Sequence, residues 1–482
     1  MFVNRFSELR DLEGLLAAGA PFLARVYGRR RLGKTELLRK VCQQRDGLYL
    51  HIDEADPLRI RTSLSRQIAQ QVQTIALPYP DWDSFLDHLV ELAPPVVVLD
   101  EFQRLHAADR IVVSRLQHRW DSQLQHQGPS LILCGSSIGM MLRLTDGRSA
   151  PLHGRFKADL RLRPFGYAAV RLLYPHLSEE DRVRRYAVFG GTPYYHSLGR
   201  DGSLEDAVRR SLLSTTAPLV DEPQSLLRLE LQEPLRYNSI LYELGNGAHQ
   251  LGDLLGKLNL ERGGLGPYLQ VLQNDLDLLT REDPLCGKQR QARYVLKDPF
   301  FRFYYRFIFD NRPRIELGRG DSVWETIEGK QLDAFVGTVF EQIARQTLQL
   351  LDGTTEQGVK VELTSTVGRW WNRQGEELDL IAIGKRELIV GEVTWSRHPA
   401  EVAVLRGLQR KAELVEERGN RPVRPVIVSR GGWTDGLQTE ARRCGCLLLS
   451  LADLSRIFDQ RYGMPQPPNP APDSVRSTDG RH

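Results

Sequence analysis

The sequence predicts an α/β protein that is built on a parallel β-sheet, with a helical part and a second α/β unit after it. Apolar runs alternate with helix-like runs between residues 21 and 164, which is the pattern of parallel strands joined by helices. The apolar runs span residues 22–27, 48–52, 96–99 and 131–134, and helices are expected at 35–44 and 58–75. A glycine-rich loop between the first run and the first helix supports the same assignment, because such a loop joins a strand to a helix.

The length and composition are those of an ordinary globular protein. At about 150 residues per domain, 482 residues suggest roughly three domains. The chain is 41% hydrophobic and 26% charged, which excludes a wholly disordered or fibrous chain. A net charge of +4 over 482 residues is too weak a field to argue by itself for a nucleic-acid partner.

We expect a cytoplasmic protein without a membrane partner. No run approaches the roughly 20 consecutive apolar residues that a membrane helix needs. Residues 1–8 carry charge where a signal peptide needs an apolar run. The five cysteines are scattered except for one C-x-C pair, which argues against a disulfide framework and against a four-ligand zinc site.

Residues 28–35 fit the pattern G-x-x-x-x-G-K-[ST] of a phosphate-binding loop, and they lie between a strand and a helix as that loop does. The loop consists of Gly28, Arg29, Arg30, Arg31, Leu32, Gly33, Lys34 and Thr35. Its glycines let backbone N–H groups wrap phosphate oxygens at a helix N-terminus, and Lys34 would neutralise charge on the β- and γ-phosphates. The hydroxyl of Thr35 is a ligand for Mg²⁺. This role explains the three arginines better than a DNA-binding patch does.

Two acids end the apolar run at 96–99. Asp100 is expected to hold Mg²⁺, directly or through water, and Glu101 to polarise the attacking water as the catalytic base. The alternative is a buried strand that ends in an acidic turn. After the run at 131–134, Ser136 is expected to contact the γ-phosphate or the attacking water, and a turn serine without that role is the alternative.

Five segments carry a family resemblance. They are Phe2-x-Asn4-Arg5-x-x-Glu8-Leu9, Tyr27-Gly28-Arg29-Arg30-Arg31-x-Gly33-Lys34-Thr35, Leu99-Asp100-Glu101, Gly135-Ser136-Ser137 and Gly190-Gly191-x-Pro193-x-Tyr195. Together they resemble the archaeal-type P-loop ATPases, which belong to the AAA+-related STAND class. The resemblance implies an AAA+-like P-loop fold and an ATP-dependent switch or motor, with ATP and Mg²⁺ as cofactors.

The resemblance also implies roles for residues outside the loop. Asn4 and Arg5 would join the nucleotide site, and Pro193 belongs to a triplet that resembles the G-x-P motif by which a helical lid senses the base. Arg155 would meet a γ-phosphate, either in its own subunit or from a neighbouring subunit of a homo-oligomer. A plain surface arginine is the alternative reading of Arg155.

Members of this family also carry a winged helix and often a C-terminal domain similar to PD-(D/E)XK nucleases. The residues agree with this order, since residues 233–298 suggest three short helices and then a basic hairpin at 284–296, and the aromatic run 300–307 suggests a buried connector helix. The expected parts are a P-loop ATPase domain at 1–165, a helical lid at 166–230, a winged helix at 231–310, a restriction-endonuclease-like α/β domain at 325–462 and a disordered tail at 463–482.

The C-terminal domain is expected to place carboxylates on a divalent metal ion. Asp379 and Glu392 would face each other across a hairpin, with Glu341 on a helix beside them, as in PD-(D/E)XK nucleases. That motif has a lysine two residues after its second acid, whereas this chain has Thr394. Lys411 or Arg410 would have to reach the site from the next helix, so nuclease activity stays open against a degenerate domain that binds without cutting.

The winged helix offers an ambiguous DNA surface. Its candidate recognition helix, at about 266–280, has neutral or acidic polar positions such as Asp275 and Asp277, whereas a helix that reads the major groove brings Arg or Lys. The wing, which is the basic hairpin at 284–296, carries three cationic residues that are candidate DNA contacts: Lys288, Arg290 and Arg293. A winged helix can equally dock a protein.

Three functions therefore remain as hypotheses. The leading one is an ATP-hydrolysing switch or motor that acts on DNA. The second is a regulatory scaffold in which ATP controls protein partners without nucleic acid. The third is an ATP-dependent nuclease, which depends on the site that contains Thr394.

Overall fold

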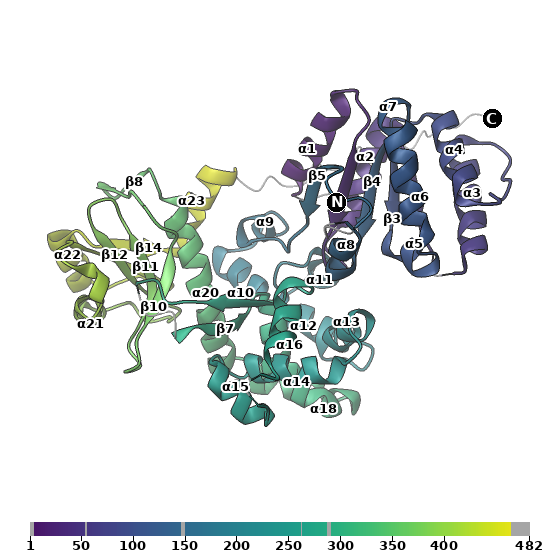
Figure 1. Ribbon diagram of the computed structural model, residues 1–482. Coiled ribbons are helices and arrows are strands. Elements are labelled where there is room, and N and C mark those ends of the chain that lie inside the picture. The colour runs from purple at the N-terminus through teal and green to yellow at the C-terminus, as the bar shows by residue number, and fades with distance from the viewer. Residues whose placement is uncertain (1–3, 54, 146–149, 262, 287–290, 464–482) are drawn as a thin grey trace, which may run out of the picture. The chain divides into compact units, whose positions relative to one another are not determined.

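The computed structural model describes residues 4–53, 55–145, 150–261, 263–286 and 291–463 (Figure 1). The chain forms two compact units. Unit 1 consists of Met1–Phe165, Ala187–Asp283 and Lys288–Glu328, and unit 2 of Gly166–Tyr186, Pro284–Gly287 and Gly329–His482. The tail predicted at 463–482 lies outside the described residues except for Gly463, and the domain boundaries given above stay predictions.

Unit 1 contains a five-stranded parallel sheet, as the alternating pattern predicts. The strands are β1 (Leu23–Tyr27), β2 (Leu48–His51), β3 (Val96–Asp100), β4 (Ser130–Gly135) and β5 (Phe156–Arg161), in the order β2-β3-β4-β1-β5. Alternate residues of β1 pack into two different core clusters, with Leu23 in one and Ala24 in the other, because both faces of the sheet are covered. Tyr27 pairs with Gly135, so the carboxyl ends of β1 and β4 meet at one edge, where open parallel sheets bind ligands.

Helices supply the two covering layers of this sheet (Figure 1). One core cluster takes its helical residues from α1 (Phe6–Ala17) and α2 (Lys34–Arg45). The other takes them from α3 (Pro57–Val72), α4 (Trp82–Leu92), α5 (Gln103–Ala108), α6 (Ile111–Arg119), the π-helical turn η1 (Trp120–Leu124) and α8 (Ile138–Thr145), and α7 (Gln125–Gln127) continues η1. Asp56 begins α3 by accepting hydrogen bonds from the N–H groups of Leu58 and Arg59.

The two edge strands of the sheet differ from the buried ones. Strand β5 was not predicted, because its sequence alternates apolar and charged residues. None of its residues is fully buried, and Lys157 and Asp159 are exposed. At the other edge, Gln67 and Gln71 of α3 each pair with both the N–H and the C=O of a residue in β2, namely His51 and Tyr49. These side-chain amides satisfy the backbone groups that an open edge leaves unpaired.

The predicted set of three helices and a hairpin is present in unit 1. It consists of α14 (Pro234–Gly245), α15 (Leu251–Leu258) and α16 (Gly266–Asn274), followed by the antiparallel strands β6 (Leu279–Glu282) and β7 (Arg293–Leu296). The prediction of the boundaries was wrong: the third helix ends at Asn274 instead of residue 280, and the hairpin begins at Leu279 instead of residue 284. Asp277 has a φ of 52°, which prevents a right-handed helix from continuing to residue 280.

The aromatic run forms a buried connector, which confirms the prediction. Its elements are α17 (Pro299–Phe303), the π-helical turn η3 (Tyr304–Ile308) and the short 3₁₀ turn η4 (Phe309–Asn311). Phe300, Phe303 and Tyr305 have no exposed surface. The remaining helices of unit 1 are α11 (Pro193–Leu198), α12 (Leu204–Leu212), α13 (Glu222–Glu230), α18 (Arg312–Glu316) and α19 (Gly320–Ile327).

Unit 2 is built on a mixed sheet. Its strands are β10 (Gly368–Trp371), β11 (Glu377–Ile383), β12 (Leu388–Thr394), β13 (Val423–Ser429) and β14 (Leu447–Ser450), in that order across the sheet. The first two pairs are antiparallel and the last two are parallel. The predicted hairpin of β11 and β12 is thereby confirmed.

Helices pack around the mixed sheet of unit 2. They are α20 (Lys330–Leu350), α21 (Val402–Glu413), α22 (Asp435–Cys444) and α23 (Leu451–Tyr462). Helix α9 (Tyr167–Arg171) packs on α23, where Tyr167 contacts Phe458. Helix α10 (Glu179–Phe189) begins in unit 2 and ends in unit 1, and unit 2 also contains a small pair of strands, β8 (Thr355–Glu356) and β9 (Val359–Lys360). In the described ranges of both units, no helix combines the length and the apolar character that crossing a membrane requires.

Candidate functional site

The glycine-rich loop joins β1 to α2, and two of its glycines are needed for its course. A Cβ at Gly28 would collide with the carbonyl of Leu162. Gly33 precedes α2 with φ 87°, a left-handed conformation that glycine adopts without strain. The N-terminus of α2 therefore opens directly onto the loop, with Lys34 and Thr35 as its first residues. This geometry suits a phosphate group, because the first N–H groups of a helix carry partial positive charge.

Lys34 lies within the loop. Its ammonium donates to the carbonyl oxygens of Gly28, at 2.7 Å, and Arg29, at 2.9 Å. Burial lowers the pKa of Lys34, and the nearby carboxylates Asp100 and Glu101 act in the opposite direction. A buried cation that is held chiefly by carbonyl oxygens gains stabilisation from an anion, which is the charge that a phosphate brings.

Asp100 and Thr35 come together as predicted. The hydroxyl of Thr35 donates to the Asp100 carboxylate at 3.0 Å, and the hydroxyl of Tyr49 donates to the same oxygen. Burial raises the pKa of Asp100, but hydrogen bonds from Cys134, Tyr49 and Thr35 outweigh it and hold the pKa below its usual value. The result is an ionised carboxylate beside a hydroxyl, and both are hard oxygen ligands that suit Mg²⁺.

Glu101 belongs to a second hydrogen-bonded group. Ser136 donates to its carboxylate at 2.9 Å. Gln103, at the start of α5, donates to the same carboxylate oxygen at 2.5 Å and to Ser136 at 3.3 Å. Ser136 therefore contacts the predicted catalytic base, and its proposed contact with a phosphate stays a prediction. Sequence reasoning missed Gln103, although its place two residues after the acids is a usable signal.

The arginines of the loop are bound by acids from distant parts of unit 1. Arg29 pairs with Asp298 at 2.7 Å, and Arg31 pairs with Glu222 of α13 at 2.5 Å. Tyr195 donates to Glu222 at 3.1 Å, which joins the predicted G-x-P segment to the same helix. No local pattern could have identified these acids, because the partners lie about two hundred or more residues apart.

Glu230, at the other end of α13, is also close to the loop. Burial raises its pKa, and a hydrogen bond with Ser137 and the charges of Arg30 and Lys34 oppose this effect. The acid was not predicted either. Helix α13 thus brings one carboxylate near the loop at each of its ends.

Arg5 holds the loop from the side of α1. It donates to the carbonyl oxygens of Leu32, at 3.2 Å, and Arg163, at 2.6 Å, and it pairs with Glu8. Its guanidinium also lies over the ring of Phe165, 4.7 Å from the centroid. Burial lowers the pKa of Arg5 while Glu8 raises it. These contacts give Arg5 a supporting position beside the loop, and its contact with a nucleotide stays a prediction.

The turn that contains the G-x-P triplet packs on Phe165, the residue whose ring lies under Arg5. The backbone N–H of Phe165 donates to the carbonyl of Gly191 at 2.7 Å, and a Cβ at Gly191 would collide with the Phe165 carbonyl. Pro193 is the first residue of α11, where its missing N–H costs nothing. Asn4 directly precedes Arg5 and has a positive φ of 64°. The base-sensing roles of Asn4 and Pro193 stay predictions.

Arg155 is occupied by other groups. It donates to both carboxylate oxygens of Asp121, at 2.7 and 2.6 Å, and to the carbonyl oxygens of Pro151 and His153. A bidentate pair of this kind fixes the guanidinium. Its predicted meeting with a γ-phosphate would require these bonds to break.

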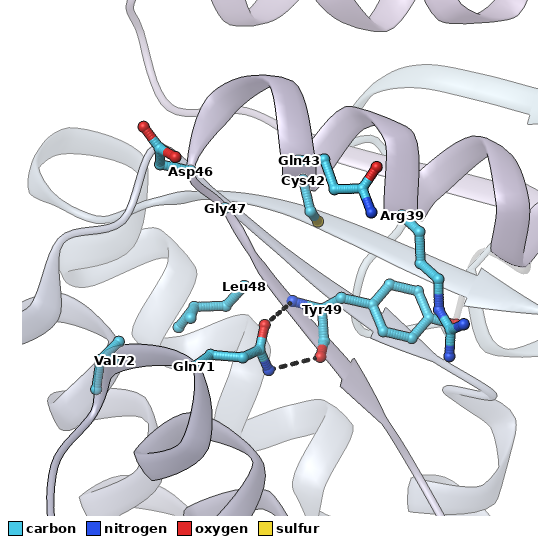
Figure 2. Close-up of a pocket in the computed structure, with 9 residues that line it drawn as sticks. All are labelled: Arg39, Cys42, Gln43, Asp46, Gly47, Leu48, Tyr49, Gln71 and Val72. Atoms are coloured by element: carbon cyan, nitrogen blue, oxygen red, sulfur yellow. Dashed lines mark hydrogen bonds between the residues drawn. The ribbon is translucent and has the colours of Figure 1, made fainter. Parts of the chain in front are cut away.

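A pocket of about 470 Å³ lies beside α2 and β2 (Figure 2). Its lining includes Arg39 and Gln43 of α2, Tyr49 of β2 and Gln71 of α3. Figure 2 shows Gln71 bonded to the backbone of Tyr49, and the guanidinium of Arg39 lies over the Tyr49 ring, 5.0 Å from its centroid. The hydroxyl of Tyr49 donates to Asp100, so a residue of the pocket lining contacts the acid that is predicted to hold Mg²⁺.

Unit 2 brings Asp379 and Glu392 to neighbouring strands. Leu380 of β11 pairs with Gly391 of β12, and Asp379 accepts a hydrogen bond from the N–H of Val393 at 2.9 Å. Lys411 of α21 pairs with Glu392 at 2.9 Å, so a lysine reaches the second acid from the helix. Burial raises the pKa of Asp379, and burial together with Asp379 raises that of Glu392.

The other candidates of unit 2 are engaged elsewhere. Arg410 pairs with Glu376. Glu341 pairs with Arg345, at 3.9 Å, and with Arg369, at 3.5 Å. Within the described parts of the chain, no group of three or more His, Cys, Asp or Glu residues is arranged to hold a metal ion. The metal set Asp379, Glu392 and Glu341 stays a prediction, and Thr394 lies at the end of β12.

The predicted DNA contacts are only partly described. Lys288 and Arg290 lie outside the described residues, and Arg293 begins β7. Asp275 and Asp277, whose negative charge argues against sequence-specific contacts of the third helix with DNA bases, both form ion pairs. Asp275 pairs with Arg143, and Asp277 pairs with Lys297 at 2.5 Å. DNA contact by the wing stays a prediction.

Comparisons with known proteins agree with this geometry. A family model described as an ATPase domain predominantly from Archaea matches residues 2–196, and one described as archaeal and bacterial proteins of unknown function matches residues 304–406. A protein of Methanocaldococcus jannaschii that is described as uncharacterised is 30% identical over 463 residues, which cover 94% of this chain and 100% of that protein.

Solved structures with similar folds include two archaeal proteins. A Walker-type ATPase of Pyrococcus abyssi has a TM-score of 0.48 and 20% identity, covering 63% of this chain and 96% of that one. The ORC2 protein of Aeropyrum pernix, in ADPNP and ADP complexes, has a TM-score of 0.42 and 15% identity, covering 68% of this chain and 96% of that one.

Proposed function

Because the chain belongs to the family of archaeal-type P-loop ATPases, we propose that it binds ATP with Mg²⁺ at residues 28–35 and hydrolyses it as a nucleotide-driven switch. Thr35 and Asp100 would hold the metal ion, which supplies positive charge to the β- and γ-phosphate oxygens. Lys34 neutralises phosphate charge in the ground state and in the transition state alike. The N–H groups at the start of α2 orient the phosphates.

The environment of Glu101 is the observation that supports hydrolysis of ATP over binding of ATP alone. Two donors, Ser136 and Gln103, hold one oxygen of its carboxylate, and the adjacent Asp100 is engaged with Thr35. The two neighbouring acids therefore have different partners and different tasks. Asp100 serves the metal ion, and Glu101 orients and polarises the water that attacks the γ-phosphate.

Two substitutions separate binding from turnover. Lys34→Ala should abolish tight ATP binding, whereas Glu101→Gln should bind ATP with nearly normal affinity and release no phosphate. Glu91→Gln, which neutralises an exposed acid of α4, is the matched control and should behave as the unaltered protein does. Turnover at the normal rate by the Glu101→Gln variant would show that another group is the base.

We also propose that DNA is the partner of this switch. The support is the order of three helices and a hairpin, with the cations that the sequence places on the hairpin. The competing function is a scaffold for protein partners. ATP turnover measured with and without duplex DNA separates the two, because stimulation by DNA favours the first and unaltered turnover with no DNA binding favours the second.

The pairing of Lys411 with Glu392 supports a second candidate function, which is metal-dependent cleavage of phosphodiesters by unit 2. The motif position after Glu392 holds Thr394, but the ammonium of Lys411 supplies the missing positive charge at the second acid. Asp379 and Glu392 would hold the divalent ion, and Lys411 would stabilise charge on the phosphate. Cleavage of DNA with Mg²⁺ or Mn²⁺ that is lost in both Asp379→Ala and Lys411→Ala supports this function, and absence of cleavage in the unaltered protein rejects it.

A further inference from the structure

The residue that begins the aromatic connector is bound to the nucleotide loop. Asp298 follows β7 of the hairpin and directly precedes α17. It lies 269 residues from Arg29 in sequence, yet the two side chains form a hydrogen-bonded ion pair of 2.7 Å. Both are buried, with side chains 6% and 2% exposed for Arg29 and Asp298. Ionised residues are rarely buried to this degree unless they are paired.

Three separate segments meet at the Asp298 carboxylate. One oxygen accepts from Arg29, and the other accepts from the N–H of Phe300 at 3.1 Å, which caps α17. The oxygen that caps α17, Oδ1 of Asp298, also lies so close to Gly190 that a Cβ at residue 190 would collide with it. Phe301 completes the enclosure of Arg29, whose guanidinium is 5.4 Å from the ring centroid. The carboxylate thus joins the loop, the glycine turn before the G-x-P triplet and the connector after the hairpin.

Arg29 links this junction to the chemistry of the loop. Its side chain is held by Asp298, and its own carbonyl accepts a hydrogen bond from Lys34 at 2.9 Å. Residues on both sides of Arg29 provide the backbone N–H groups that would surround phosphate oxygens. Holding the Arg29 side chain in place therefore restrains the part of the loop backbone to which Lys34 is bonded.

We propose that Asp298 is a positioning residue of the nucleotide site: it holds Arg29, and through Arg29 it fixes the loop in the conformation that binds the phosphates of ATP and ADP. The inference rests on the proposed binding of nucleotide at residues 28–35. It makes nucleotide affinity depend on the segment that joins the hairpin to the aromatic connector. A partner that moves this segment would thereby change nucleotide binding without touching the nucleotide.

The test compares three full-length proteins by titration with fluorescent ADP and with a non-hydrolysable ATP analogue. Asp298→Asn keeps the shape of the side chain and removes the charge that pairs with Arg29. We expect Kd for both nucleotides to rise by the same factor, about tenfold, because the loop contacts the phosphates that both share. Asp277→Asn is the matched control, since it removes a buried acid that pairs with Lys297, the neighbour of Asp298, and its Kd should equal that of the unaltered protein.

A purely structural role predicts a different result. Thermal unfolding reports the stability of each protein, and the titrations are made well below the unfolding temperature. If Asp298→Asn lowers the unfolding temperature but leaves both Kd values unchanged, the positioning role is wrong. If the unaltered protein binds neither nucleotide, the proposed function itself fails, and that result differs from failure of the positioning role alone.

A second variant displaces the Asp298 carboxylate without changing any charge. Gly190→Ala places a methyl group against the Asp298 oxygen at a φ of 64°, and Gly19→Ala introduces comparable backbone strain at φ 75° with nothing within 4 Å. We expect Gly190→Ala to raise both Kd values and Gly19→Ala to leave them unchanged. Equal Kd values for these two variants would contradict the inference even if the Asp298→Asn protein failed to fold.

Discussion

Replacing Gln103 by Leu tests whether the geometry around Glu101 produces hydrolysis. Gln103 donates to the Glu101 carboxylate and to Ser136, while its Oε1 atom is buried and accepts no hydrogen bond from the residues that the structure describes. Leucine keeps most of the volume and removes that unpaired oxygen, so we expect the fold to tolerate it. The variant therefore removes one donor from the predicted base with little other change.

The charge of the acceptor sets an upper bound on the effect, because the hydrogen bond contributes to the rate only as far as it holds the base in the orientation that the transition state needs. A hydrogen bond to a charged group contributes roughly 1.5–3 kcal/mol, and 1.36 kcal/mol corresponds to a tenfold change in rate. Since Ser136 continues to hold the carboxylate, we expect kcat to fall by about tenfold to a hundredfold. KM for ATP should change little, because Gln103 contacts the base and not the loop.

Steady-state phosphate release at saturating ATP, with KM measured on the same samples, is the appropriate assay. Gln125→Leu removes a glutamine whose side chain, among the residues that the structure describes, bonds only to the backbone carbonyl of Asp121. This variant should leave both constants unchanged. The reasoning fails if Gln103→Leu has normal kcat, or if its defect lies in KM instead.

Three further predictions concern other parts of the chain. Replacing Lys288, Arg290 and Arg293 together by Ala should weaken DNA binding alike for all sequences and flatten the slope of log affinity against log salt by up to about three units; an unchanged slope would remove the wing from the DNA surface. Glu222→Gln should lower Kd for ATP severalfold in a nucleotide titration, because Arg31 loses its charged partner and gains freedom to pair with phosphate, and a raised Kd would contradict this role. Burial raises the pKa of Asp333, but Arg184 and Arg430 outweigh it and hold the pKa below its usual value. Its ionised form therefore stabilises unit 2 at neutral pH, and this stability is lost as pH falls through the lowered pKa. Asp333→Asn should therefore lower the unfolding temperature at pH 7, and the difference from the unaltered protein should disappear once pH falls below the lowered pKa. A constant difference at all pH values would refute this assignment.

The sequence was sufficient for the features that depend on neighbouring residues. Buried strands such as β3 are continuous apolar runs, and the loop at 28–35 has a fixed spacing because its backbone wraps a phosphate. Strand β5 was missed because an edge strand needs only one apolar face, so its alternating pattern resembles an exposed segment.

Contacts between distant residues could not be predicted in this way. The pairing of Arg29 with Asp298 and of Arg31 with Glu222 depends on how the helical part folds back on the loop within unit 1. The sequence predicts that Lys411 or Arg410 could reach the site from the next helix. In the structure Lys411 pairs with Glu392, whereas Arg410 pairs with Glu376. The position of a side chain on α21 relative to β12 is a property of packing, which no spacing in the sequence specifies.

The most direct test of ATP hydrolysis at this site is a single-turnover experiment. Protein in excess over labelled ATP, with Mg²⁺, is stopped at intervals, and both the bound nucleotide and the released phosphate are measured. We predict that bound ATP is converted to ADP and phosphate in the unaltered protein, whereas the Glu101→Gln variant retains intact ATP. Bound ATP that stays intact in the unaltered protein, or equal conversion by the two proteins, would contradict catalysis by Glu101.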